Sequence, residues 1–371
     1  MSEPLKVGLV GCGIIARNAY VPFSKDAQTA FEIVACCDVR QEVAAALAKD
    51  FEIPQVYSSI EALLGDKEID VILNLTHPAA HAPINMQALQ AGKHVYCEKP
   101  FALSVEEGED VLALANNKDL KVGCAPDTVL GPGTQTIRKM IDDGAIGRPL
   151  SVRLQMASPG VEHWHTNPEF YYQVGGGPLL DMGPYYLSLL VQTLGPVRSV
   201  QGRATRGFNE RPIRCQPLEG KVMQVETPTL YTGSLETVSG VIVQILFSFD
   251  HCYGQQSDNI PEFFGTIGAI RGTDPNLFDQ VPQLSNTFAS SDFVDHIVPF
   301  DYKGGRGLGL VDMIEAIREG REPRCSGAVA QHVLEVILAF HESERMGATV
   351  EIKSTCKRPL PMAADGLADL K

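Results

Sequence analysis

The stretch Lys6-Val7-Gly8-Leu9-Val10-Gly11-Cys12-Gly13-Ile14-Ile15-Ala16 joins an apolar run to a glycine-rich turn and the apparent start of a helix. The run Lys6–Val10 is typical of a buried β-strand. Gly11 permits a tight turn, Gly13 lets a phosphate approach the backbone, and Ala16 allows the helix to pack closely. Because the glycines stand between a strand and a helix, the stretch predicts a dinucleotide-binding βαβ unit.

The next strand predicts how a dinucleotide would be recognised. Ile14 and Ile15 open the helix and would offer backbone N–H groups to the pyrophosphate. A second strand, Glu32–Cys37, ends in Asp38, somewhat over ~20 residues past the glycines, where a carboxylate binds a ribose 2′-hydroxyl. This favours NAD over NADP. Two alternatives remain: Arg40 could accept a 2′-phosphate, and Asp38 could simply cap a helix.

Strands and helices continue to alternate through the first third of the chain. The sequences Ser58-x-x-Glu61 and Ser104-x-x-Glu107 have the pattern of helix capping boxes. Further apolar strands are expected at Asp70–Leu75, Val95–Cys97 and Lys121–Cys124. This alternation predicts a doubly wound parallel sheet, which we place in a Rossmann domain of residues 1–125.

Polar residues follow two of these strands, at the edge of a parallel sheet where ligands bind. Thr76-His77-Pro78 closes one strand, with His81 shortly after it, and Glu98-Lys99-Pro100 closes another. Proline after Lys99 disfavours the helical region for the lysine and holds an extended turn. Lysine is rarely buried unless it is paired, and Glu98 is adjacent. The alternative is a surface Glu–Lys pair at a strand end.

The pattern changes after Cys124, so we assign residues 126–371 to a second domain. A helix is expected over Thr134–Asp143, and two late helices have apolar residues at helical spacing. The longer strand-like runs are typical of an antiparallel or mixed sheet. These strands are Leu150–Met156, Val197–Ala204 and Val238–Phe249, and the late helices are Leu308–Glu319 and Val329–Met346.

A glycine run, Gly175–Gly177, precedes the most informative part of this second domain. If a helix begins near Leu179, Asp181 and Tyr185 lie four residues apart on one face. Pro184 would be tolerated only in the first turn. A carboxylate and a phenol on one face make a plausible proton-handling pair, although Asp181 could be only a helix-start charge.

Upstream, Glu162-His163-Trp164-His165-Thr166-Asn167 contains the only tryptophan of the chain. Trp164, His165 and Asn167 would form a polar and aromatic wall for a hydroxylated ligand. The His-x-His spacing could also suggest a metal, but no third ligand is apparent and we expect none. Asp127 follows the first domain and would either face the same ligand or close a turn.

Length and composition limit the classes of function. A chain of 371 residues is too long for one typical core and predicts two domains. A net charge of −14 argues against nucleic acid or an anionic membrane as partner. Neither a membrane span nor a signal peptide is expected. Nine cysteines, an odd number mostly in apolar runs, favour reduced thiols in the cytoplasm.

Three motifs together resemble the Gfo/Idh/MocA family of NAD(P)-dependent oxidoreductases, over nearly the whole chain. They are Gly11-x-Gly13-x-x-Ala16, the block from Ala91 to Pro100 that contains Glu98-Lys99-Pro100, and Gly175-Gly176-Gly177…Asp181-x-Gly183. The resemblance implies an α/β fold: a Rossmann domain, and a second α/β domain with an open, largely antiparallel sheet. That second domain would bind substrate and form homodimers or homotetramers.

The same resemblance implies roles for individual residues. Lys99 matches the active-site lysine of the family and Asp181 the aspartate of its motif, while Thr76, His81 and Glu98 belong to the cofactor-binding block. Two positions depart from the family pattern. Tyr185 stands where histidine is usual, and Thr76-His77-Pro78 stands where Thr-Pro-Asn is usual.

Taken together, we expect a dehydrogenase that oxidises a hydroxyl of a sugar or cyclitol with NAD, or less readily NADP. Lys99 would accept the hydroxyl proton, Asp181 would orient lysine and substrate, and Tyr185 would donate a hydrogen bond. Two alternatives remain open. One is an NAD-dependent glycosidase that uses transient oxidation, and the other is a non-catalytic, cofactor-sensing regulator.

Overall fold

The protein is described by a computed structural model that covers residues 3–251, 259–286 and 292–370. The chain divides into two compact units. Unit 1 consists of Met1–Pro132, Pro299–Leu334 and Pro359–Lys371, and unit 2 of Gly133–Val298 and Glu335–Arg358. The first unit is therefore discontinuous in sequence, whereas the sequence analysis placed a single boundary after residue 125.

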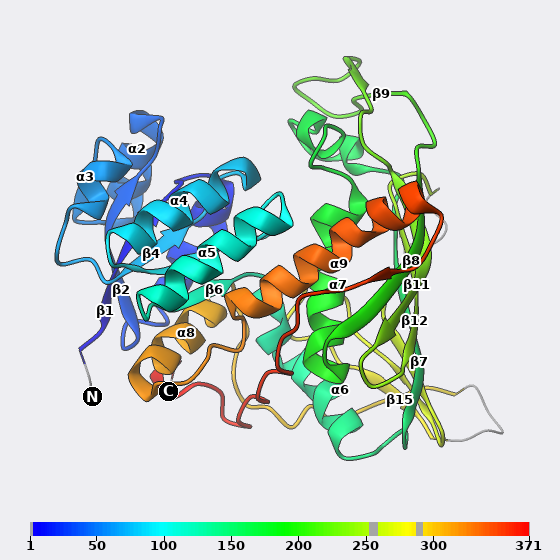
Figure 1. Ribbon diagram of the computed structural model, residues 1–371. Helices are drawn as coiled ribbons and strands as arrows, with labels where there is room; N and C mark the ends of the chain where they lie inside the picture. The colour runs from blue at the N-terminus through cyan, green and yellow to red at the C-terminus, as the bar shows by residue number, and fades with distance from the viewer. Residues whose placement is uncertain (1–2, 252–258, 287–291, 371) are drawn as a thin grey trace. The chain divides into compact units, whose positions relative to one another are not determined.

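Unit 1 is built on a fully parallel sheet, six-stranded among the described residues, with the order β3-β2-β1-β4-β5-β6 (Figure 1). The strand order reverses between β1 and β4, as in a Rossmann fold, and ligands bind outside the carboxyl ends of the strands at such a point. The strands are β1 (Leu5–Val10), β2 (Phe31–Cys37), β3 (Gln55–Tyr57), β4 (Val71–Asn74), β5 (His94–Cys97) and β6 (Val122–Cys124). The predicted doubly wound sheet is confirmed.

Helices connect the strands of unit 1. The chain is helical from Ile14, with a π-helical stretch, η1 (Ala16–Tyr20), before α1 (Val21–Ser24). The cap predicted at the start of α5 (Val105–Asn117) is confirmed, because the Ser104 hydroxyl accepts a bond from the Glu107 N–H at 3.2 Å. The returning bond of the capping box is displaced by one residue, since the Glu107 carboxylate accepts from the Leu103 N–H at 3.0 Å. The other helices are α2 (Gln41–Phe51), α3 (Ile60–Leu64), α4 (Pro78–Gln90), α5 (Val105–Asn117) and α8 (Leu308–Glu319).

The capping box predicted at Ser58 is wrong by one residue. Ser59 caps α3 instead, and its hydroxyl accepts a bond from the Ala62 N–H at 3.2 Å. Glu61 therefore lies in the first helical turn, where a negative charge is favourable.

The later segments complete unit 1 at its edge strand. Gly123 of β6 pairs with Ser326 through an antiparallel bridge, and the Cys124 N–H donates to the Cys325 carbonyl at 2.9 Å. The α8 helix packs against β6. Residues about two hundred positions downstream thus belong to the same unit and cover its edge strand.

Unit 2 contains a large mixed sheet, nine-stranded among the described residues, with the order β16-β15-β14-β13-β7-β12-β11-β8-β17. In this sheet, β7 and β12 form the only parallel pair among the described residues, and the other pairs are antiparallel. The open, largely antiparallel sheet is therefore confirmed. Its strands are β7 (Pro149–Ala157), β8 (Val197–Thr205), β11 (Leu230–Thr237), β12 (Ile242–Ser248), β13 (Glu262–Gly265), β14 (Ala269–Arg271), β15 (Gln283–Ser285), β16 (Val294–Asp295) and β17 (Val350–Glu351).

Helices cover one face of this sheet, with α6 (Pro132–Asp142) and α7 (Pro178–Leu194) on the same side in Figure 1. The α7 helix packs against β7, β11 and β12. The helix α9 (Gly327–Met346) leaves unit 1 and enters unit 2. A separate pair of short strands, β9 (Glu210–Pro212) and β10 (Val222–Gln224), forms a hairpin-like extension beyond β8.

Two details of unit 2 differ from the sequence analysis. Residues 238–241 form a turn rather than the start of β12, because Gly240 takes a φ of +83° and the Val241 N–H donates to the Thr237 hydroxyl at 3.0 Å. Pro184 lies in the second turn of α7, not the first. A proline there removes one helical hydrogen bond, which the extensive burial of α7 offsets.

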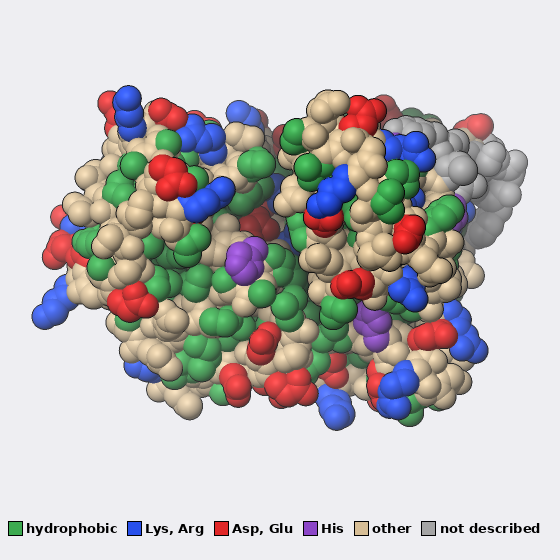
Figure 2. Space-filling view, turned by 90° about the horizontal axis from the view of Figure 1, so that it is seen from above, with side chains coloured by type: hydrophobic (Ala, Val, Ile, Leu, Met, Phe, Trp, Pro, Cys, Tyr) green, Lys and Arg blue, Asp and Glu red, His purple; other side chains and the backbone are tan. Residues whose placement is uncertain are grey.

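The surface carries charges of both signs, interspersed on the face that Figure 2 shows. In the described ranges, no helix combines the length and the apolar composition needed to span a bilayer. The eight cysteines of the described residues are free, and six of them are buried.

Candidate active site

The glycine-rich turn after β1 has the geometry of a dinucleotide cradle. Gly11 has a φ of +91°, and a Cβ built there would lie 2.8 Å from the Leu75 carbonyl carbon. The turn packs against the backbone of the segment after β4, so only glycine fits at position 11. A Cβ at Gly13 would meet nothing within 4 Å. That open space lies beside the first turn of the helix from Ile14, where a pyrophosphate binds in this fold.

Asp38 lies at the carboxyl end of β2 and holds this turn in place. Its Oδ2 accepts a bond from the Cys12 N–H at 2.8 Å, and its Oδ1 accepts one from the Arg40 N–H at 2.9 Å. Neither bond comes from an N–H inside α2 (Gln41–Phe51), whose N-cap is Arg40, so the capping alternative is wrong. A carboxylate has about four acceptor positions, so both oxygens retain capacity for a ribose hydroxyl. The Arg40 residue is exposed.

A buried amide organises the segment after β4. The Asn74 Oδ1 accepts bonds from the Thr76 hydroxyl at 2.7 Å and the Thr76 N–H at 3.3 Å. The Asn74 amide group donates to Asn85 Oδ1 at 2.9 Å. Thr76 is thereby fixed at the sheet edge, while the next residue, His77, is exposed at the start of α4.

His81 joins the two polar segments of the sheet edge. Its ring is fully buried, with Nδ1 2.6 Å from the Pro100 carbonyl oxygen and Nε2 3.0 Å from the Thr76 carbonyl oxygen. Burial lowers the pKa of His81, and the two carbonyls oppose that shift. The imidazole ties the residues after β4 to those after β5, including the turn that carries Lys99.

Glu98 and Lys99 follow β5 at the same edge. The buried Glu98 carboxylate accepts a bond from the Tyr20 hydroxyl at 2.9 Å through Oε1, and from the Lys99 N–H at 3.0 Å through Oε2. Two donors thus hold this carboxylate, and one of them is the backbone of the lysine itself. The Lys99 residue is half-buried. The surface-pair alternative is wrong for Glu98, which is 7% exposed.

Asp127 is fully buried in unit 1, in the short helix η2 (Asp127–Leu130). Its Oδ2 accepts bonds from the Gly307 N–H at 2.7 Å and the Gly309 N–H at 3.2 Å. It therefore caps α8, although its predicted contact with substrate stays a prediction. Burial raises the pKa of Asp127 to about 6, and the positive charge of Arg306 opposes that shift.

This raised pKa predicts a pH-dependent stability. Folded protein binds the Asp127 proton more tightly than unfolded protein, so this contribution is complete below about pH 4 and is lost as pH rises to about 6. Relative to wild type, Asp127→Asn should gain up to about 3 kcal/mol of unfolding free energy across that window. Urea unfolding at several pH values measures this. The exposed Glu109→Gln is the control; parallel curves for all three proteins would contradict the assignment.

In unit 2 the glycine run sets the start of α7. Gly177 has a φ of +94°, and a Cβ there would lie 2.8 Å from the Pro228 carbonyl oxygen. The helix begins at Pro178, as expected from the sequence, and the Asp181 N–H donates to the Gly177 carbonyl at 3.1 Å. Asp181 and Tyr185 are one helical turn apart, the first half-buried and the second buried. Their predicted placement on one face follows from this spacing.

The segment before α7 brings Trp164 and His165 together. Their ring centroids lie 5.4 Å apart, and the His165 ring also contacts Phe170 and Tyr171 edge-on. Trp164 is 65% exposed. The Asn167 N–H donates to His165 Nδ1 at 3.1 Å, which leaves Nε2 as the donor nitrogen of a neutral ring.

Burial lowers the pKa of His165, which favours the neutral ring, while the negative charge of Asp181 in α7 opposes that shift. Among the described residues, no three His, Cys, Asp or Glu side chains are grouped to hold a metal ion.

Several residues that organise the site were missed in the sequence. Asn74 ends the apolar strand β4, and a polar amide within an otherwise apolar run was the signal that could have marked it. Tyr20 bonds to Glu98 across 78 positions, a pairing that no local pattern reveals. Arg211 was also missed, because its partners Glu162 and Asp250 come from separate segments.

A Rossmann sheet with a glycine cradle, an acidic residue after β2 and a half-buried lysine after β5 defines an NAD-binding oxidoreductase domain. Two family models agree. Residues 5–125 match the oxidoreductase family with an NAD-binding Rossmann fold, and residues 134–271 match the GFO/IDH/MocA C-terminal domain. The chain belongs to the GFO/IDH/MocA family of oxidoreductases.

Similar proteins include enzymes that act on sugars. The chain is 26% identical over 353 residues to 1,5-anhydro-D-fructose reductase from Ensifer adhaerens, covering 94% of this chain and 98% of the relative. It is 29% identical over 253 residues to D-glucoside 3-dehydrogenase from Escherichia coli, covering 67% and 71%. The fold is shared with levoglucosan dehydrogenase in complex with NADH and L-sorbose, at a TM-score of 0.80, 22% identity, and 94% and 99% coverage.

Proposed function

We propose that this protein is an NAD-dependent dehydrogenase that oxidises a secondary or anomeric hydroxyl of a sugar or cyclitol. The observation that carries the proposal is the half-buried Lys99 at the carboxyl end of β5, at the same edge of the sheet as a glycine cradle that fits a dinucleotide. Similar proteins named for reactions on sugars support the substrate class. The second-unit wall of Trp164, His165 and Asn167 offers an aromatic surface and polar donors, which suit a hydroxylated ring.

The roles of the residues follow from the needs of the reaction. When bound, the nicotinamide supplies a hydride acceptor. Hydride loss from carbon requires a base for the hydroxyl proton within hydrogen-bond reach. Lys99 Nζ is the proposed acceptor, because the positive charge of a bound nicotinamide would disfavour the ammonium form of the lysine. Asp181 would orient substrate and lysine, and Tyr185 would donate a hydrogen bond to the substrate oxygen.

A panel of free sugars, cyclitols and glycosides tests this proposal. Purified protein with NAD should produce NADH, followed by absorbance at the reduced nicotinamide band, with at least one class of substrate. Release of free sugar from a glycoside without net NADH would instead favour a glycosidase with transient oxidation. Binding of NAD without turnover of any compound would favour a cofactor-sensing regulator.

Cofactor preference gives a separate prediction. Asp38 should accept a bond from the adenosine ribose, so kcat/KM should be higher with NAD than with NADP. Asp38→Ser should relax this preference, because losing a partner for a buried polar group costs roughly 1–3 kcal/mol. Steady-state kinetics with both cofactors measure it.

Arg40→Ala is the matched control for this prediction, since Arg40 lies two residues away and is exposed. It should leave the preference for NAD unchanged. A wild-type enzyme that works better with NADP, and loses that preference in Arg40→Ala, would assign the selection to Arg40.

The expected assembly follows from the family resemblance, and the expected location follows from the cysteines in apolar runs. We expect homodimers or homotetramers in the cytoplasm, and light scattering of the purified protein measures the oligomeric state.

A further inference from the structure

A buried charge cluster in unit 2 joins segments that are far apart in the sequence. Glu162 lies in the short helix η3 (Val161–His163), just before Trp164, and is 2% exposed. Arg211 lies in β9 and is 8% exposed. Asp250 follows β12, at the end of the sheet. Charged side chains are rarely buried unless they are paired, so this cluster needs a physical reason.

One guanidinium makes all the connections. Arg211 Nε lies 2.9 Å from Glu162 Oε1, and Nη1 lies 3.1 Å from Asp250 Oδ1. Nη1 also donates to the Phe249 carbonyl at 2.8 Å, and Nη2 donates to the Pro159 carbonyl at 2.8 Å. The Arg211 guanidinium therefore holds two segments against β9: the one around Glu162 and the end of β12.

The remaining oxygens of the two carboxylates are also satisfied. The Tyr172 hydroxyl donates to Glu162 Oε2, in a short hydrogen bond. The Thr229 hydroxyl donates to Asp250 Oδ2 at 2.6 Å, and the Gly207 N–H donates to the same oxygen at 3.1 Å. A fully connected buried network specifies one arrangement of its segments.

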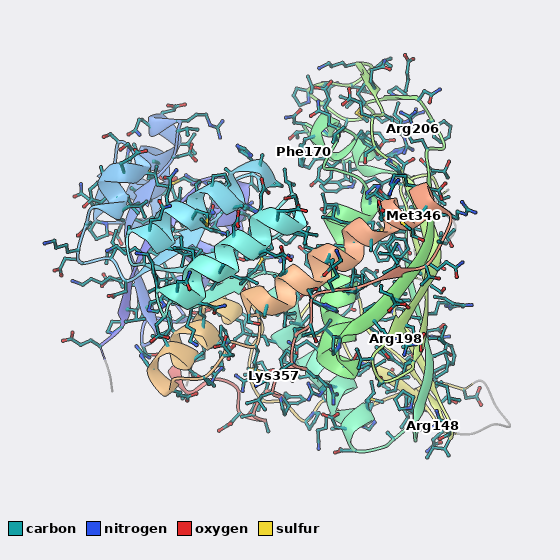
Figure 3. All side chains as sticks on the ribbon, in the orientation of Figure 1. Arg148, Phe170, Arg198, Arg206, Met346 and Lys357 are labelled. Carbon is teal, nitrogen blue, oxygen red and sulfur yellow. The ribbon has the colours of Figure 1, made fainter. Side chains whose placement is uncertain are left out.

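Backbone bonds join the same two excursions of the chain, residues 158–177 and 206–229. The Arg214 N–H donates to the Glu162 carbonyl at 3.0 Å, and the Glu226 N–H donates to the Tyr172 carbonyl at 2.7 Å. Figure 3 shows Phe170 and Arg206, one from each excursion, at the same end of the unit 2 sheet. The two excursions form one structure, which we call the arm.

The arm carries the predicted substrate wall. Trp164 and His165 follow Glu162 by two and three residues, and the Cys215 thiol lies 3.1 Å from the His165 carbonyl oxygen. A buried ion pair often adds little net stability compared with apolar packing, because desolvation offsets the attraction. Here the buried ion pairs instead fix the position of Trp164 and His165.

We propose that Glu162, Arg211 and Asp250 form a latch that positions the wall for sugar recognition, which makes Arg211 a positioning residue of the substrate site. The inference rests on the proposed function, in which Trp164 and His165 border the sugar. The latch depends on the fork of arginine, since an ammonium group cannot reach both carboxylates and two carbonyls with the same geometry. The 206–229 excursion then controls specificity through the position of the wall.

Trp164 gives a direct test, because it is the only tryptophan of the chain. In Arg211→Met and Arg211→Lys, the fluorescence anisotropy of Trp164 should fall and quenching by acrylamide should rise, with the larger change in the methionine variant. The kcat/KM for the best sugar of the panel should fall by about 10²-fold, as for a displacement near 1 Å, while KM for NAD stays unchanged. Arg203→Met, an exposed arginine of β8, is the control and should change none of these values.

Tyr172→Phe is a milder change that tests the latch even if the arginine variants fail to fold. It removes one hydroxyl donor to Glu162, keeps both ion pairs, and should lower the anisotropy and the kcat/KM for the sugar by less than the arginine variants do. Wild-type values of the anisotropy and of the kcat/KM for the sugar in the folded variants would overturn the latch. A wild-type enzyme that oxidises no sugar would overturn the proposed function instead, and the anisotropy would still decide whether the latch fixes Trp164.

Discussion

Lys99→Met should bind NAD with wild-type affinity and lose at least about 10²-fold in kcat, because a positioned base contributes about 10²–10⁴-fold. Lys99 is half-buried at the end of β5, and its own N–H donates to the buried Glu98. Replacing the amine therefore leaves the backbone that shapes the turn in place. Single-turnover kinetics and NAD titration separate the two effects.

Lys99→Arg distinguishes a base from a mere positive charge. Arginine keeps the charge but cannot be deprotonated in proteins, so this variant should be about as inactive as Lys99→Met. Tyr185→Phe should lose less activity than either, and the exposed Lys67→Met should match wild type. If Tyr185→Phe were nearly inactive while Lys99→Met kept its turnover, Tyr185 would be the proton acceptor.

Gly13→Ala should weaken NAD binding by at least about tenfold, or about 1.4 kcal/mol, without loss of stability. A Cβ at Gly13 meets no protein atom within 4 Å, so the folded chain accepts it. The same Cβ would occupy the space that a pyrophosphate needs in this fold. Titration with NAD and thermal unfolding, measured on the same sample, give both quantities.

Gly11→Ala is the matched comparison, because this substitution should lower the stability of the protein itself. At a φ of +91° its Cβ would lie 2.8–2.9 Å from backbone atoms of Leu75 and Thr76. Strain of this kind costs about 1–3 kcal/mol before any overlap is counted, so Tm should fall even in the absence of NAD. Undiminished NAD affinity in Gly13→Ala would mean that the pyrophosphate is held elsewhere.

The sequence predicted most of unit 1, because local signals there agree with one another. The glycine turn, the apolar strands and the Ser104 cap each depend on residues within a few positions. The helix α8 was predicted with the bounds that the structure has, Leu308–Glu319, from its apolar periodicity. The start of α7 followed from the glycine run and Pro178.

The rest depended on contacts between distant segments. Nothing near residue 300 signals that the chain returns to unit 1, since the return is a matter of packing against β6. The cluster of Glu162, Arg211 and Asp250 spans almost ninety positions, and each residue alone has the pattern of a surface charge. Pro184 in the second turn of α7 shows that burial can outweigh a local rule.

The discontinuity of unit 1 has a consequence for how the protein is made. The outer edge of β6 is covered only by Cys325–Ser326, and the buried Asp127 carboxylate finds its donors only at Gly307 and Gly309. At ~5–20 residues per second, a ribosome that has finished Pro132 needs roughly 10–40 s to reach them. During that interval unit 2 can begin to fold. In unit 1, meanwhile, the outer edge of β6 is still uncovered and the Asp127 carboxylate still lacks its two backbone donors. Translation of unit 1 therefore begins before that of unit 2 and ends after it.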